Sequence, residues 1–124
     1  MPGSVLICDD NEVMRSLLRE TLVGRGYAIA EAQDGDESIE LARKMRPDLI
    51  VLDLMMPGQS GLDVLAILRD EPGLAETPVV LLTAAQRAFD RVGTDVFGAD
   101  RYLVKPFSPI ELLSVVEELL PAGS

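Results

Sequence analysis

The sequence contains no histidine among its 124 residues. Histidine is the usual base beside a nucleophilic serine, a frequent zinc ligand, and the side chain whose pKa best suits proton transfer near neutral pH. Its absence excludes serine–histidine hydrolase triads, zinc sites built with histidine, and acid–base chemistry by an imidazole.

Cysteine is almost absent as well, because Cys8 is the only one and lies inside an apolar run. A single thiol excludes a disulfide framework and suits a reducing compartment. No apolar stretch reaches the roughly 18 residues that a membrane-spanning helix needs, and no signal peptide is evident at the N-terminus. We therefore expect a cytoplasmic protein without membrane association.

Positive charge is scarce, with 11 lysines and arginines against 21 aspartates and glutamates and a net charge of −10. The phosphate backbone of a nucleic acid would be repelled by such a surface. The composition therefore argues against direct binding of nucleic acid by this chain.

Five short apolar segments, bounded by turn-forming residues, predict buried β-strands. The predicted strands cover residues 5–8, 27–32, 49–52, 79–82 and 102–104. Amphipathic segments alternate with them and predict helices. The predicted helices cover about 12–25, 35–46, 61–70, 88–97 and 109–120. This alternation predicts one α/β domain over residues 1–120, a parallel sheet with helices on both faces, and residues 121–124 as a flexible tail or the start of a linker.

Polar residues follow four of the predicted strands: Asp9 and Asp10, then Asp53, Thr83 and Lys105. The carboxyl ends of parallel strands share one edge of a sheet, so these side chains are expected to converge there. Three carboxylates repel one another unless a cation neutralises them, and hard oxygen ligands without histidine or cysteine favour Mg²⁺.

This combination of residue types is typical of phosphoryl transfer. Lys105 supplies a positive charge for a phosphoryl oxygen, and Thr83 supplies a hydroxyl donor. Asp53 then remains as a nucleophile that can form an acyl phosphate. Arg15 lies near this acidic group in the sequence, and we interpret it as a charge on the face of its helix.

These motifs, in this order, resemble the receiver domain of two-component response regulators over about residues 4–120. The motifs are Asp9-Asp10, Asp53 with Met56-Pro57-Gly58 and Gly61, Leu82-Thr83-Ala84, Gly98-Ala99-Asp100, Tyr102, and Lys105-Pro106-Phe107. The resemblance implies a flavodoxin-like, doubly wound (βα)5 fold with a five-stranded parallel sheet in the order 2-1-3-4-5.

The resemblance also implies roles for individual residues. Asp53 would be the phosphoacceptor, and Asp10, Asp53 and the backbone carbonyl of Met55 would bind Mg²⁺, with Asp9 acting on the metal through water. Lys105 would contact the phosphoryl group and Asp53.

Thr83 and Tyr102 would form the family's switch pair, and the Lys105–Pro106 bond would be cis. The implied partners are a histidine kinase or a histidine phosphotransfer protein as donor, and an output domain or partner protein as reader. Because the chain lacks histidine, it cannot donate a phosphoryl group from a phosphohistidine of its own.

The resemblance allows a homodimer through the last two helices. Arg101, however, occupies a position where many dimerising members carry aspartate, and the last predicted helix contains no arginine. This difference argues against dimerisation through the usual ion pairs.

Three other functions share part of this pattern. A phosphorylation-independent pseudo-receiver would have lost a key residue, and none is lost. An Mg²⁺-dependent aspartyl-phosphate phosphatase needs an acid two residues after its nucleophile, where this chain has Met55. A flavin-binding module would share the fold, but no phosphate loop of that kind is recognisable and aromatic residues make up only 4% of the chain.

Overall fold

The computed structural model describes residues 3–83 and 99–120. These residues contain a sheet whose neighbouring strands all run parallel, in the order β2-β1-β3-β4-β5, which confirms the predicted fold. The strands are β1 (Ser4–Cys8), β2 (Ala28–Ala32), β3 (Leu49–Asp53), β4 (Val79–Thr83) and β5 (Arg101–Val104). The helix predicted at 88–97 and the tail predicted at 121–124 lie outside the described residues.

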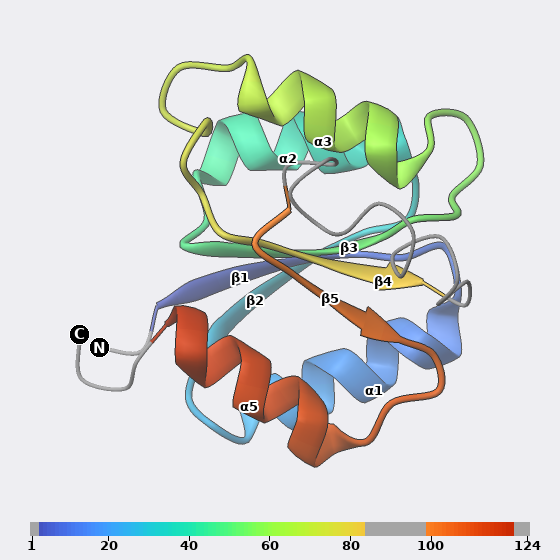
Figure 1. Ribbon diagram of the computed structural model, residues 1–124, viewed down its shortest axis with the longest axis vertical. Helices are drawn as coiled ribbons and strands as arrows, with labels where there is room; N and C mark the ends of the chain where they lie inside the picture. The colour runs from blue at the N-terminus through green and yellow to red at the C-terminus, as the bar shows by residue number, and fades with distance from the viewer. Residues whose placement is uncertain (1–2, 84–98, 121–124) are drawn as a thin grey trace.

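Helices cover both faces of the sheet (Figure 1). One face carries α1 (Glu12–Val23) and α5 (Pro109–Leu119), and the other carries α2 (Gly35–Met45) and α3 (Gly61–Arg69). Side chains alternate between the faces of a strand, so Leu6 packs with the α2 and α3 layer while Val5 packs with the α1 and α5 layer. The sheet is therefore buried on both sides, as its continuous apolar strands require.

Each described helix begins at a polar side chain that accepts a backbone hydrogen bond. Asp34, Ser60 and Ser108 all do so, and Ser60 and Ser108 form full capping boxes with the third helical residue. Asn11 caps α1 in the same way by accepting from the Met14 N–H. Each cap fixes the residue at which its helix begins, and so fixes the length of the loop that joins the helix to the carboxyl end of the preceding strand.

The apolar side chains of α1 are only partly buried against the sheet. Leu18 and Leu22 are fully buried, but Val13 is 79% exposed and Leu17 is 39% exposed. A helix turns roughly 100° per residue, which places Leu17 about 100° and Val13 about 140° away from Leu18. Only the narrower side around Leu18 faces the sheet.

The helix itself ends at Val23, two residues before the predicted boundary. Within the described ranges, no helix is both long and apolar enough to cross a membrane.

Candidate functional site

The structure brings the predicted acidic residues together at the carboxyl edge of the sheet. Strands β1, β3 and β4 end there, and β5 delivers Lys105 to the same edge (Figure 1). Asp9, Asp10 and Asp53 each offer a carboxylate oxygen within 4.8 Å of the others. Asp9 and Asp53 are buried, whereas Asp10 is exposed.

Lys105 bridges the two buried carboxylates. Its Nζ lies 3.2 Å from Asp9 Oδ2 and 3.4 Å from Asp53 Oδ1. Its backbone N–H donates to the Thr83 carbonyl over 2.7 Å, which ties the end of β5 to the end of β4. The following Lys105–Pro106 peptide bond is cis.

The loop after Asp53 is held by the backbone of its neighbours. Leu54 N–H donates to the Leu82 carbonyl, which continues the pairing of β3 with β4, and the Leu54 carbonyl accepts from Gly61 N–H. A Cβ on Gly61 would lie only 2.3 Å from the Asp53 carbonyl oxygen. The start of α3 can therefore approach Asp53 this closely only because residue 61 is glycine.

Burial raises the pKa of the Asp53 carboxyl, and the negative charge of Asp9 raises it further. The Lys105 ammonium and the Met55 N–H, which donates to Asp53 Oδ1 over 3.2 Å, oppose this rise without cancelling it. The positive charge of Lys105 is therefore not enough to neutralise the carboxylates of the site.

A divalent cation would supply the missing charge, and three hard oxygen donors suit Mg²⁺. The residues present thus fit the metal that the sequence predicted. The Met55 carbonyl as a further ligand stays a prediction; the Met55 side chain is 72% exposed.

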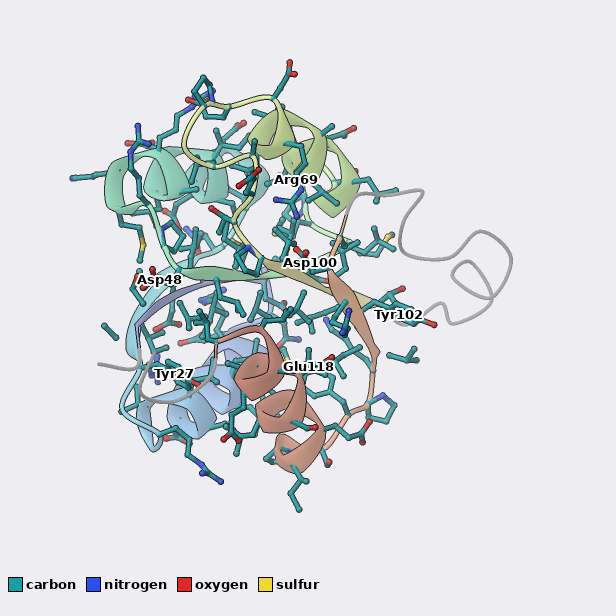
Figure 2. All side chains as sticks on the ribbon, turned by 60° about the vertical axis from the view of Figure 1, so that its left-hand side comes forward. Tyr27, Asp48, Arg69, Asp100, Tyr102 and Glu118 are labelled. Atoms are coloured by element: carbon teal, nitrogen blue, oxygen red, sulfur yellow. The ribbon has the colours of Figure 1, made fainter. Side chains whose placement is uncertain are left out.

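The predicted switch residues lie on adjacent strands. Thr83 is buried at the end of β4, and Tyr102 on β5 pairs in register with Leu81. Tyr102 is partly buried against the apolar cluster on the α2 and α3 face and lies on the edge strand of the sheet (Figure 2). Their switching roles stay predictions.

Arg15 is more than the charge on a helix face that the sequence suggested. Its side chain is only 15% exposed, and its Nη1 donates to the Asp9 carbonyl over 2.8 Å. Its Nε also lies 3.4 Å from Glu31 Oε1 on β2. Its position in the second turn of the helix that follows Asp10 was a signal that could have indicated this contact.

Arg101 also has a partner within the chain. Its guanidinium pairs with Glu118 of α5, and both side chains lie on the surface. Arg101, which departs from the usual dimerisation pattern, is therefore neutralised by Glu118 within one molecule.

Comparisons with known proteins agree with this geometry. The family profile described as "Response regulator receiver domain" matches residues 5–117. A probable transcriptional regulatory protein of Mycobacterium tuberculosis, TcrX, is 44% identical over 120 residues, which cover 96% of this chain and 50% of that protein. The transcriptional regulatory protein ResD of Bacillus subtilis is 42% identical over 97% of this chain and 49% of its own length.

The chain thus spans about half the length of these curated relatives. Among solved structures, the chemotaxis response regulator CheY4 of Vibrio cholerae superposes with a TM-score of 0.90 at 32% identity. That match covers 97% of this chain and all of the other.

Proposed function

The chain belongs to the response regulator receiver family, and on that premise we propose that it is a phosphorylation-controlled switch with Asp53 as acceptor. The phosphoryl donor would be a histidine kinase or a histidine phosphotransfer protein. One observation carries the proposal: a buried carboxylate at a strand end shares Lys105 with Asp9. Such a carboxylate is open to chemistry because its charge is only partly neutralised.

The transfer is a displacement at phosphorus. An Asp53 carboxylate oxygen attacks the phosphorus of the donor's phosphohistidine, so that a P–O bond forms and the P–N bond breaks. The electron pair of the broken bond returns to that ring nitrogen, and because the other ring nitrogen of the phosphohistidine carries a proton, the donor leaves as a neutral imidazole. A raised pKa makes the Asp53 carboxylate more basic, which favours its attack once it is deprotonated.

Other residues of the chain stabilise the charge on the transferred group. The Lys105 ammonium lies 3.4 Å from Asp53 Oδ1. After transfer it can therefore move its contact from the Asp53 carboxylate to a negatively charged phosphoryl oxygen. Thr83, at the end of the adjacent strand, would donate a hydrogen bond from its hydroxyl to a second phosphoryl oxygen. Asp9, Asp10, Asp53 and the Met55 carbonyl would hold Mg²⁺, which when bound neutralises phosphoryl oxygens.

The acceptor can be tested with a small acyl phosphate and Mg²⁺. Intact-mass measurement should show one added phosphoryl group in the wild type and none in Asp53→Asn. The matched control is Asp48→Asn, because Asp48 precedes the same strand and lies at its opposite end. Labelling of Asp53→Asn to the wild-type level would contradict the assignment, whereas equal loss in Asp48→Asn would indicate a general defect.

The readout requires a second component. We propose that an output domain or partner protein recognises the phosphorylated form, and that Thr83 and Tyr102 relay the change to the β5 and α5 surface. A homodimer through the last two helices would need another set of contacts, because Arg101 already pairs with Glu118.

A further inference from the structure

Asp9 is bonded at each of its polar groups. Its N–H donates to the Ala32 carbonyl over 3.1 Å, its Oδ1 accepts from Asn11 N–H over 2.9 Å, and its Oδ2 contacts Lys105. Its carbonyl accepts from Arg15 Nη1. Arg15 is therefore a backbone contact of the acidic loop and not only a surface charge.

The Arg15 contact also controls Asp10. The peptide unit joining Asp9 to Asp10 is planar, so holding the Asp9 carbonyl fixes the direction in which the Asp10 Cα leaves the strand. Asp10 is exposed, and its place beside Asp9 and Asp53 depends on the backbone that carries it.

Glu31 orients the Arg15 guanidinium from the neighbouring strand. Glu31 pairs in register with Ile7 on β1, and its two carboxylate oxygens are divided between two arginines. Oε1 lies 3.4 Å from Arg15 Nε, and Oε2 lies 2.7 Å from Arg19 Nη1. The planar fork of arginine can hold a carboxylate and a carbonyl in one fixed arrangement.

We propose that Arg15, oriented by Glu31, is a positioning residue that preorganises the Asp9–Asp10 loop for a divalent cation. This inference rests on the proposed function, in which these aspartates bind Mg²⁺. Residues that orient metal ligands commonly change metal affinity by about 10–100-fold when they are removed.

Electrostatics alone predicts the opposite sign. A guanidinium close to a cation site repels Mg²⁺, so removing its charge without any change of structure would tighten binding. Loss of positioning would instead weaken binding. The direction of the change therefore separates the two explanations.

The test is an Mg²⁺ titration of the whole chain, followed by amide chemical shifts. Arg15→Gln should raise the Mg²⁺ Kd about 10-fold. The rate of phosphorylation by a small acyl phosphate should fall at low Mg²⁺ and recover towards the wild-type rate at saturating Mg²⁺. Arg15→Lys keeps the positive charge but not the planar fork, so charge alone predicts an unchanged Kd, whereas loss of positioning predicts a higher Kd. This variant serves alone if Arg15→Gln does not fold.

Arg43→Gln is the matched control, because Arg43 is also paired with a glutamate, Glu71, but is exposed on α2. Its Kd should equal that of the wild type. Unchanged or tighter binding in Arg15→Gln, or in Arg15→Lys where Arg15→Gln does not fold, would overturn the inference. If the wild type itself neither bound Mg²⁺ nor accepted phosphate, the proposed function would fail instead.

Discussion

The two edges of the sheet use aspartate in opposite ways. At the amino edge, Asp48 Oδ2 accepts from the N–H and the hydroxyl of Ser4, over 2.8 and 3.2 Å. Asp100 Oδ2 accepts from Val79 N–H over 2.8 Å and from Arg69 Nη2 over 3.0 Å. At the carboxyl edge, Asp9 and Asp53 each accept one backbone N–H, but their two negative charges share the single ammonium of Lys105.

The difference shows how the same side chain can either stabilise a fold or prepare a site. Asp48 and Asp100 each join the starts of two strands, and Figure 2 shows Asp100 beside Arg69. A carboxylate that accepts from donors in its own chain contributes to the free energy of unfolding. Carboxylates that repel each other lower that free energy until a ligand neutralises them.

The largest effect is expected from disturbing the backbone of the carboxyl edge. Gly61→Ala should lower the free energy of unfolding by about 3 kcal/mol, because the new Cβ would overlap the Asp53 carbonyl and force α3 away. Phosphorylation of Asp53 should fall as well. Urea unfolding and intact-mass labelling measure the two effects.

Gly24→Ala is the control, since its Cβ would come no closer than 3.4 Å to its nearest neighbour. Equal stability of Gly61→Ala and Gly24→Ala would contradict the packing argument.

Mg²⁺ should stabilise the carboxyl edge selectively. Binding at 100 times the Kd would add about 2.7 kcal/mol to the free energy of unfolding. The rise in Tm with Mg²⁺ should be much smaller in Asp10→Ala and unchanged in Asp48→Ala. A full Mg²⁺ response in Asp10→Ala would move the metal to other ligands.

Breaking an amino-edge carboxylate should destabilise the protein whether or not Mg²⁺ is present. Asp100→Ala leaves the part-buried Val79 N–H without this acceptor and removes an ion pair of Arg69, which costs about 1–2 kcal/mol. Asp100→Asn keeps an acceptor oxygen and should lose less. Thermal unfolding with and without Mg²⁺ gives both values, and a loss that Mg²⁺ abolished would show that the two edges are not independent.

The smallest change in the free energy of unfolding is expected from Asp53→Asn without Mg²⁺. Unlike the changes above, this one should stabilise the protein. A carboxyl whose pKa is raised on folding adds stability below its unfolded pKa, and this stability is lost as the pH rises through the folded pKa. The asparagine variant has no such titration at this position.

It should therefore become more stable relative to wild type as the pH increases from acidic to neutral. Urea unfolding in a chelating buffer across that range measures the difference. If the difference in free energy of unfolding between Asp53→Asn and the wild type did not change with pH, the pKa of Asp53 would not be raised.

Much of the architecture could be predicted because its signals are local. The strands are continuous apolar runs, and the caps Asp34, Ser60 and Ser108 act within three residues of their own positions. Once the strands were predicted to be parallel, the convergence of Asp9, Asp53 and Lys105 followed from where their strands end.

The tertiary structure alone decided what depends on distant neighbours. Val13 and Leu17 are exposed because the sheet covers only one side of α1, which the spacing of apolar residues does not define. The contact of Arg15 with the Asp9 carbonyl depends on the direction of one backbone oxygen, and the place of Gly61 depends on how closely α3 approaches β3. The raised pKa of Asp53 likewise depends on burial and on Asp9, 44 positions earlier in the sequence, because electrostatic interactions act through space rather than along the chain.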